Sequence, residues 1–418
     1  MDKIIIEGGY PLKGEVSISG AKNSILPLLF SSLLTDKPCF FDRIPHLRDV
    51  ATTYKILKSF GVAIDEGEHQ SHVQALSIKN PFAHYDLVRT MRASVLALGP
   101  LLARCGYAKI ALPGGCAIGA RPINLHLSAL QKLGADIRLE EGYVIATAKK
   151  LRGAPIYFET PTVTGTENLM MAAVLADGHT VLDNAAREPE IVDLAKCLKK
   201  MGATISGEGT SRIEIEGKPS LSGVHYTVMG DRIEAGTYLV AAAATGGDVT
   251  LLGCDPEHVT AILSKLEEMG ADIAVSNEFQ KIRIQGRDLR NIKLSTEPYP
   301  GFPTDMQAQM MVLATRARGT SIIVENIFEN RFMHVCELQR MGAKIEIQGH
   351  SAVIEGGVSL KGAPVMATDL RASVCLVIGG LMASGTTEIN RVYHLDRGYE
   401  EIEKKLKGLG AHIERIRD

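Results

Sequence analysis

The sequence lacks an excess of charge, paired cysteines and long hydrophobic runs, and each lack argues against a class of protein. A formal net charge of −2 leaves no basic surplus for a nucleic-acid backbone or an anionic membrane. The seven cysteines are odd in number, scattered and without CxxC spacing, which argues against a disulfide framework and a zinc site. No apolar run reaches the roughly 18 residues of a membrane span, and the start MDKIIIEGGY does not read as a signal peptide. We expect a cytoplasmic protein without a metal or cofactor, whose partner is a small molecule.

A repeat is the strongest positive feature of the sequence. A phrase made of an amphipathic helix end, a glycine and a short strand recurs six times, about every 70 residues. The copies are LKSFGVAID, LQKLGADIR, LKKMGATIS, LEEMGADIA, LQRMGAKIE and LKGLGAHIE. A glycine at the end of a helix is typical of a left-handed C-terminal cap. Each repeat therefore predicts a helix, a glycine cap and a strand.

Each repeat also contains an earlier helix, about 40 residues before this phrase, which opens with polar residues and is apolar nearly all round. The six helices are predicted in GAKNSILPLLF, TMRASVLALGP, TGTENLMMAAV, DRIEAGTYLVAAA, TDMQAQMMVLA and TDLRASVCLVIGG. Apolar residues on every face indicate a buried helix. Strands such as RIEIEG (212–217) alternate in polarity, so one face of each sheet meets water. With a short strand before the first helix, as in APIYFE, the pattern predicts six β-α-β-α-β-β units with buried helices and outer sheets.

Six units divide naturally into two domains of three. We place the N-terminal domain at residues 21–229 and the C-terminal domain at residues 1–20 plus 230–418. The first twenty residues carry only opening strands and the last unit lacks closing strands, so we expect the N-terminal segment to pair with the C-terminal domain. Helix N-termini carry partial positive charge, and those of both domains would attract an anion into a cleft between the domains.

The segment LPGGCAIGARP (112–122) places Cys116 among three glycines, with Arg121 close by. A cysteine kept for packing would lie in an apolar run, whereas this backbone is poor at burying anything. A nearby cation lowers the pKa of a thiol and makes the sulfur reactive. The loop is equally compatible with a chance thiol in a glycine-rich hairpin, and both interpretations stay open from the loop alone.

A small set of cations at or near helix starts suggests a phosphorylated substrate, because arginine binds phosphate and carboxylate in a bidentate manner. The set is Lys22, Arg92, Arg121, Arg331, Arg371 and Arg397. Asp305 and Asp369 follow threonines at helix starts, where an acid is often only a cap. His126, His334 and His394 have no spacing of metal ligands, and we interpret them as structural.

Several motifs together resemble those of the UDP-N-acetylglucosamine enolpyruvyl transferases, over the whole chain. They are GAKNSILP, TMRAS, LPGGCAIGARP, NAAREPEIVDLA, PTDMQAQ, ENRFMHV, ATDLRAS and YHLDRGYE. The resemblance implies a pair of inside-out α/β barrels in a bacterial cytoplasmic transferase. The implied reaction moves the enolpyruvyl group of phosphoenolpyruvate to the 3-hydroxyl of UDP-N-acetylglucosamine and releases phosphate, as the first committed step of peptidoglycan synthesis. Cys116, where some relatives carry Asp, implies susceptibility to fosfomycin.

The same resemblance implies roles for individual residues. Lys22, Arg121 and Arg397 would hold phosphoenolpyruvate, with Arg331 and Arg371 lining its site. Asp369 would make a further contact to the substrates. The residues expected to bind the nucleotide sugar are Asn23, Arg92, Arg121, Pro122, Ile123, Asn124, Leu125, Thr162, Val163, Asp305 and Ile327. Catalysis would fall to Cys116, Asp305, Lys22 and Arg397. Asp305 would take the proton of the sugar hydroxyl, and Cys116 would protonate the methylene carbon and could form a thioketal adduct.

Two other functions remain open at this point. Enolpyruvylshikimate-phosphate synthase shares the fold and the chemistry, but that family does not carry the GGCxxGARP loop. A non-catalytic paralogue would bind the nucleotide sugar and act through protein contacts.

Overall fold

One repeated pattern generates six four-stranded sheets, and it is clearest between Pro155 and Glu216. Its elements are β10 (Pro155–Tyr157), α6 (Val163–Ala173), β11 (His179–Asp183), α7 (Pro189–Lys200), β12 (Thr204–Ser206) and β13 (Arg212–Glu216). β10 is parallel to β11, and β13 is antiparallel to both β11 and β12, which gives the order β10-β11-β13-β12. All six sheets have this arrangement of one parallel and two antiparallel pairs.

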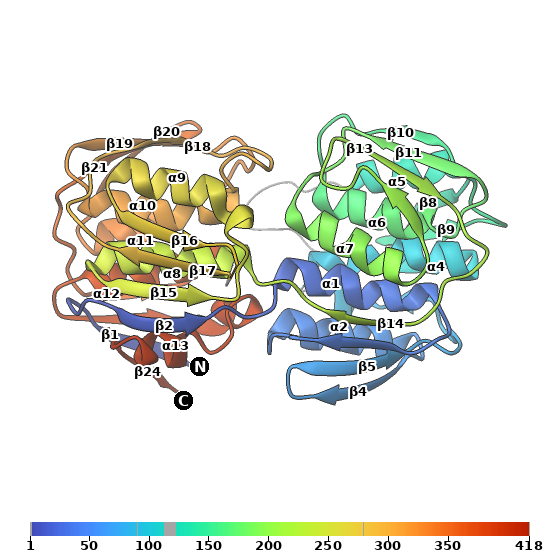
Figure 1. The fold of residues 1–418 in the computed structure, drawn as a ribbon, viewed down its shortest axis with the longest axis horizontal. Helices are drawn as coiled ribbons and strands as arrows, with labels where there is room; N and C mark the ends of the chain where they lie inside the picture. Colours follow the sequence, from blue (N-terminus) through green and yellow to red (C-terminus); the bar gives the residue numbers. More distant parts are fainter. Residues whose placement is uncertain (1, 90, 113–122, 279, 418) are drawn as a thin grey trace. The chain divides into compact units, whose positions relative to one another are not determined.

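The computed structural model describes residues 2–89, 91–112, 123–278 and 280–417. The chain forms two units (Figure 1). Unit 1 contains the residues up to Ser19 and those from Gly230 onward, and unit 2 contains the described residues between Gly20 and Met229. Each unit holds three of the sheets.

Unit 2 contains three sheets, two built around the elements before β10 and one from β10 to β13. Its remaining elements are α1 (Lys22–Ser31), η1 (Ser32–Leu34), β3 (Cys39–Asp42), α2 (Arg48–Ser59), β4 (Ala63–Gly67), β5 (Gln70–Gln74), β6 (Phe82–Ala83), α3 (Tyr85–Val88), η2 (Arg92–Ala97), α4 (Leu98–Cys105), β7 (Tyr107–Ala111), α5 (Asn124–Lys132), β8 (Asp136–Glu140), β9 (Tyr143–Thr147) and β14 (Val224–Thr227).

Unit 1 repeats the pattern with strands from both ends of the chain. Its elements are β1 (Lys3–Glu7), β2 (Lys13–Ser17), α8 (Arg232–Thr245), β15 (Asp248–Leu252), η3 (Pro256–Val259), α9 (Thr260–Met269), β16 (Asp272–Ser276), β17 (Lys281–Gln285), β18 (Lys293–Ser295), η4 (Thr304–Met306), α10 (Gln307–Arg316), β19 (Thr320–Val324), α11 (Val335–Arg340), β20 (Lys344–Gln348), β21 (Ser351–Glu355), β22 (Pro364–Met366), α12 (Leu370–Met382), β23 (Thr386–Asn390), η5 (Val392–Arg397), α13 (Ile402–Gly408) and β24 (His412–Ile416).

Two strands are exchanged relative to the simple repeat. β2 precedes α1 in the chain, yet it pairs in parallel with β15 of unit 1. β14 precedes α8, yet it pairs in parallel with β3 of unit 2. β1 lies between β23 and β24, so it supplies one closing strand of the last repeat. The expectation that this repeat lacks closing strands is therefore corrected, because β24 is present and β1 completes the pair.

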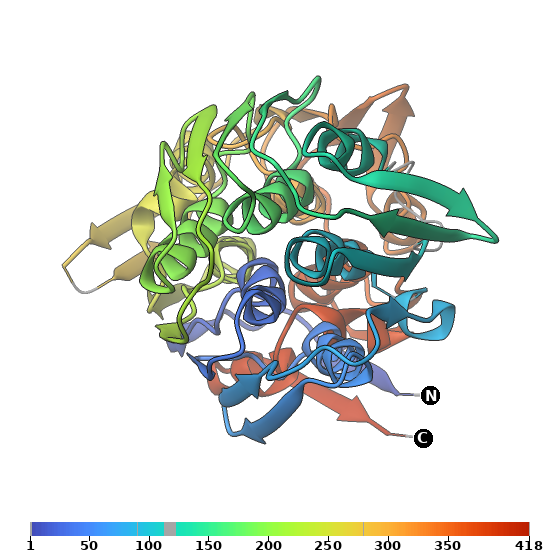
Figure 2. The same cartoon turned by 90° about the vertical axis from the view of Figure 1, so that its right-hand side faces the viewer.

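The first helix of each repeat, which is apolar nearly all round, is enclosed by its unit, as that apolarity predicts. In α8 every residue from Arg232 to Ala244 is buried, and in α12 every residue from Leu370 to Leu381. Figure 2 shows the helices of unit 2 nearly end-on, with strands outside them. β13 shows the matching strand pattern, since Ile213 and Ile215 face the core while Arg212 and Glu216 are exposed. Buried helices with outer sheets confirm the predicted inside-out α/β fold.

The six repeated glycines end the outer helices for a backbone reason. Gly61, Gly134, Gly202, Gly270, Gly342 and Gly410 have φ angles between +91° and +101°. In this region a Cβ atom is strained, so glycine is the residue that closes the helix and turns the chain into the next strand. Among the described residues, no helix is long and apolar enough to cross a bilayer.

Candidate active site

Asp305 is held between two arginines in unit 1. Arg331 Nη2 donates to Asp305 Oδ1 and Arg371 Nη2 donates to Asp305 Oδ2, each at 2.7 Å. The three residues come from different elements, namely η4, the loop after β19 and the first turn of α12. Both arginine side chains are almost fully buried, while the Asp305 side chain is 24% exposed. The fold thus brings together three residues predicted for the substrate site.

The two ion pairs control the protonation of Asp305. Burial alone would raise the pKa of this carboxyl group, but the charges and hydrogen bonds of Arg371 and Arg331 outweigh burial and hold the pKa well below its usual range. Asp305 is therefore a carboxylate at any pH near neutrality. Its backbone carbonyl accepts a hydrogen bond from Gln309 Nε2 at 2.9 Å, which also fixes the start of α10.

Asp369 makes different contacts, although it stands at a similar helix start. Its Oδ1 accepts hydrogen bonds from the backbone N–H groups of Arg371 at 2.8 Å and Ala372 at 3.0 Å, so it is the N-cap of α12. Among the other predicted residues of unit 1, Arg397 ends η5 and Ile327 lies in the loop after β19 with 36% of its surface exposed. Asp369 thus holds the helix that carries Arg371.

In unit 2, Lys22 is the first residue of α1 and its Nζ lies 3.2 Å from Asp49 Oδ2. Asp49 belongs to the first turn of α2 and is buried. Ser24 Oγ donates to Asp193 Oδ2, and Tyr226 OH donates to Asp193 Oδ1 at 2.7 Å. These contacts fix the start of α1, which also carries Asn23.

The buried side chain of Asn168 in α6 connects elements of unit 2 that carry predicted nucleotide-sugar residues. Asn168 Nδ2 donates to the carbonyl of Val95 at 3.1 Å and lies 3.1 Å from His126 Nδ1, while Asn168 Oδ1 accepts from Gly99 N at 2.7 Å. His126 Nε2 lies 3.3 Å from Thr164 Oγ1. The network therefore joins η2, α4, α5 and α6. The first turns or flanking residues of η2, α5 and α6 supply the predicted contacts Arg92, Ile123, Asn124, Leu125, Thr162 and Val163.

His126 is uncharged near neutral pH. Burial and, to a smaller extent, the charge of Arg92 lower the pKa of its imidazole to about 4. The same holds for His334, where burial lowers the pKa to about 4. Sequence reasoning treated His126 as structural and overlooked Asn168. An amide inside the otherwise apolar run NLMMAAV was the available signal.

Three predicted site residues, Cys116, Arg121 and Pro122, lie outside the described residues, and their roles stay predictions.

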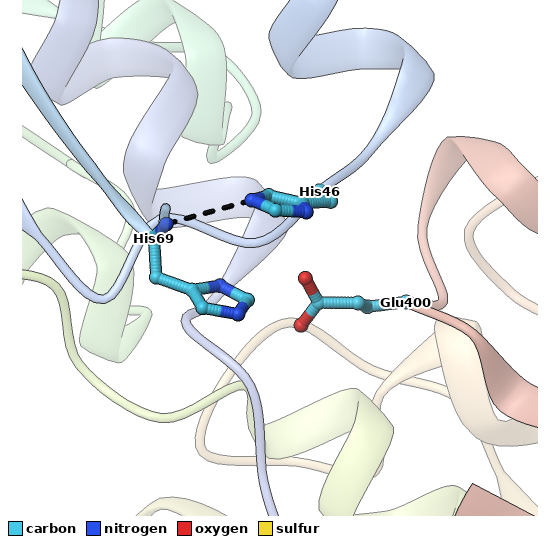
Figure 3. A group of neighbouring side chains, drawn as sticks. All are labelled: His46, His69 and Glu400. Carbon is cyan, nitrogen blue, oxygen red and sulfur yellow. Dashed lines mark hydrogen bonds between the residues drawn. The ribbon is translucent and has the colours of Figure 1, made fainter. Parts of the chain in front are cut away.

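His46 and His69 form a stacked pair in unit 2, with ring centroids 4.4 Å apart. The backbone N–H of His69 donates to His46 Nε2 at 3.5 Å (Figure 3). His69 lies in the β4–β5 turn and His46 just before α2, so the pair fixes one end of that hairpin. Figure 3 also labels Glu400 of unit 1, whose Oε2 accepts a hydrogen bond from Ser19 Oγ at 2.7 Å within that unit. Within the described part of either unit taken alone, no three side chains are placed to ligate one metal ion.

Comparison with known proteins places these features in a family. Residues 6–406 match the family described as EPSP synthase (3-phosphoshikimate 1-carboxyvinyltransferase). The chain belongs to the EPSP synthase family.

Relatives within this family share more than half of their residues with the chain. A protein of Nitratidesulfovibrio vulgaris (strain DP4) is 57% identical over 99% of both chains, and one of Magnetococcus marinus is 56% identical over 100% of both. Both are named UDP-N-acetylglucosamine 1-carboxyvinyltransferase. The resemblance inferred from the sequence motifs is confirmed.

Solved structures confirm the fold. The enolpyruvyl transferase NikO from Streptomyces tendae superposes with a TM-score of 0.89 at 23% identity, covering 99% of this chain and 98% of that one. EPSP synthase from Acinetobacter baumannii superposes with a TM-score of 0.78 at 18% identity over the whole of both chains.

Proposed function

We propose that the protein transfers the enolpyruvyl group of phosphoenolpyruvate to the 3-hydroxyl of UDP-N-acetylglucosamine and releases phosphate. The observation that carries this proposal is the 57% identity, over 99% of both chains, to a protein named for that carboxyvinyl transfer. The reaction is a step of peptidoglycan synthesis, and we propose that the protein works in the cytoplasm. The described cysteines are all free thiols, which fits a reducing compartment.

The charges of the site suit two anionic substrates. Phosphoenolpyruvate carries a carboxylate and a phosphate, and the nucleotide sugar carries a diphosphate. Arg331 and Arg371 present guanidinium groups that are buried and already oriented by Asp305. Arginine binds such groups in a bidentate manner, and little side-chain freedom remains to be lost. Lys22, Arg121 and Arg397 complete the proposed phosphoenolpyruvate site.

Asp305 is the proposed base, and its ion pairs set a condition on that role. A carboxylate whose pKa lies far below neutrality accepts a proton weakly. When the substrate anions bind, they compete with Asp305 for Arg331 and Arg371, and the pKa of Asp305 rises toward its usual value. Asp305 would therefore become an effective base only after the substrate anions have bound.

The proposed proton transfers balance over two steps. In the addition step the sugar oxygen bonds to C2 of phosphoenolpyruvate, Asp305 accepts the hydroxyl proton and the Cys116 thiol protonates C3. In the elimination step the bond from C2 to the phosphate oxygen breaks, and C3 returns a proton to the Cys116 thiolate, which restores the double bond. The proton held by Asp305 leaves with the phosphate. The glycines around Cys116 would let its loop deliver the thiol, and Cys116 would make the enzyme susceptible to fosfomycin.

Phosphate release with alternative acceptors tests the proposal. We expect the purified protein to release phosphate from phosphoenolpyruvate with UDP-N-acetylglucosamine and not with shikimate 3-phosphate, the acceptor of the runner-up activity. Cys116→Ser should lose turnover near neutral pH and still bind the sugar nucleotide, because a hydroxyl is a far weaker acid than a thiol. The matched control is Cys336→Ser, which changes an exposed thiol in α11.

The outcomes separate the alternatives. Release with shikimate 3-phosphate alone would favour the runner-up activity. Binding of the sugar nucleotide without release of phosphate would favour the non-catalytic paralogue. Full turnover by Cys116→Ser would remove the proposed acid.

A further inference from the structure

We propose that Glu325 is a positioning residue that orients Arg331 and Asp305 for the reaction, an inference that rests on the proposed function. Glu325 directly follows β19 and is 1% exposed. Its Oε1 accepts hydrogen bonds from Thr296 Oγ1 and Ile327 N at 2.9 Å and from Phe328 N at 3.1 Å. Its Oε2 accepts a hydrogen bond from Thr304 Oγ1 at 2.9 Å. One buried carboxylate thus connects the residue that follows β18, the loop after β19 and the first residue of η4.

The Oε1 contacts shape the loop that leads to Arg331. Two successive backbone N–H groups, of Ile327 and Phe328, point at the same oxygen, which fixes the direction of the chain after β19. The ring of Phe328 then lies under the Arg331 guanidinium, 5.1 Å from its central carbon to the ring centroid. Glu325 therefore determines the position of the Phe328 ring on which the Arg331 guanidinium stacks.

The Oε2 contact sets the direction of a hydroxyl. Thr304 gives its only O–H hydrogen to Glu325, so its oxygen lone pairs are free to accept from Arg331 Nη1 at 2.9 Å. Arg331 uses its other terminal nitrogen for Asp305, the neighbour of Thr304 in the chain. The planar guanidinium is thereby fixed by two bonds to adjacent residues. The order of donation runs from Arg331 to Thr304 and from Thr304 to Glu325.

Glu325→Gln tests this order with almost no change in shape. The amide oxygen can keep the three donors at the Oε1 position, which leaves an NH₂ group facing Thr304. That group donates and cannot accept, so the Thr304 hydroxyl loses the acceptor of its hydrogen and has to share its lone pairs between two donors, the new NH₂ group and Arg331 Nη1. We expect kcat to fall about 10- to 100-fold, the size of effect that a misplaced catalytic group causes. The KM for UDP-N-acetylglucosamine should change less than about threefold, because the loop contacts at Ile327 remain.

Two substitutions of Thr304 provide an independent test should Glu325→Gln fail to fold. Thr304→Val removes the hydroxyl and should lower kcat to a similar extent, whereas Thr304→Ser keeps the hydroxyl and should retain most of the activity. In the double variant Glu325→Gln with Thr304→Val, the loss should not exceed that of one substitution, since both break the same relay. Glu355→Gln, at an exposed glutamate paired with Lys344, is the matched control and should leave kcat unchanged.

The wild-type assay separates this inference from the proposed function. If the wild-type protein releases no phosphate with UDP-N-acetylglucosamine, the proposed function fails and this inference fails with it. If the wild type is active and Glu325→Gln lowers the melting temperature while kcat stays normal, Glu325 is only structural. Normal kcat in Thr304→Val, or equal losses in Thr304→Val and Thr304→Ser, would also overturn the inference.

Discussion

Glu167 is a single residue whose protonation the fold has changed. It lies in the first half of α6 with 2% of its surface exposed, and its Oε1 has no hydrogen-bond partner among the described residues. Burial raises the pKa of this carboxyl group well above its usual value, and the nearby carboxylates of Glu190 and Glu188 raise it further. Glu167 is thus protonated over a range of pH in which the unfolded chain carries the charge.

The stability of the protein should therefore depend on pH through Glu167. Because its pKa is higher in the folded state, the folded form binds more protons, and the free energy of unfolding falls as pH rises above the unfolded value. Glu167→Gln mimics the protonated acid and removes this dependence. At pH values between the pKa of Glu167 in the unfolded chain and its pKa in the folded protein, the free energy of unfolding of the variant should rise relative to that of the wild type. We expect a rise of up to about 1.4 kcal/mol per pH unit. Denaturant unfolding at a series of pH values between 5 and 8 measures the gain.

Glu216→Gln, at an exposed position of β13, is the control for the loss of one carboxyl group. A gap between Glu167→Gln and the wild type that stays constant from pH 5 to pH 8 would show that Glu167 titrates normally.

Single residues also show which part of the site the sequence could predict. Asp305 and Asp369 both follow a threonine at a helix start, and local patterning gives no reason to treat them differently. In the structure Asp369 caps α12, whereas Asp305 binds two arginines that come from distant segments. Local capping follows from neighbours in the chain, but an ion pair depends on tertiary packing. For the same reason no local pattern marked Glu325 and Thr304, whereas Asn168 could have been noticed as an amide in an apolar run.

Among the helices, α8 shows how much a cap contributes. Asp231 Oδ1 accepts hydrogen bonds from the backbone N–H groups of Ile233 at 2.8 Å and Glu234 at 3.0 Å. Asp231→Ala leaves these two donors buried without that acceptor. We expect the free energy of unfolding to fall by about 1 to 2 kcal/mol, measured by denaturant unfolding.

The control for the cap is Asp231→Asn, which keeps a side-chain oxygen and should lose clearly less stability. Equal losses in Asp231→Ala and Asp231→Asn would mean that the charge of Asp231, and not its capping bonds, stabilises α8.

Elements differ in how far their sequence reveals them. The glycine-capped helices were predictable because the cap, the apolar face and the following strand lie within one short phrase. The partners of the strands were harder to predict. The N-terminal segment was expected to pair in the C-terminal domain, as β2 does with β15, whereas no strand pattern of β14 indicated its pairing with β3 of unit 2. A strand pattern specifies which face is buried and does not specify the neighbour. The short helices η2 and η4 were likewise expected as the first turns of α-helices.

Across the whole molecule, the residues proposed to bind the sugar nucleotide come from both units. Arg92 belongs to unit 2, while Ile327 and Asp305 belong to unit 1. The net charge of −2 attracts no anion by itself, so affinity has to come from the local set of cations. The proposal therefore requires both units for binding, and a change in either one should weaken it.

Binding linked to unfolding can test this requirement on the intact chain. At 100 times its dissociation constant, UDP-N-acetylglucosamine should raise the free energy of unfolding by about 2.7 kcal/mol and raise the melting temperature. Arg92→Gln in unit 2 and Ile327→Asp in unit 1 should each reduce that ligand-induced shift at the same ligand concentration, the first by removing a cation and the second by placing an acid beside an anion. Ile347→Asp, at an exposed position of β20, should keep the full shift. A full shift in Ile327→Asp together with none in Arg92→Gln would mean that unit 2 alone binds the ligand, and the two-unit proposal would be wrong.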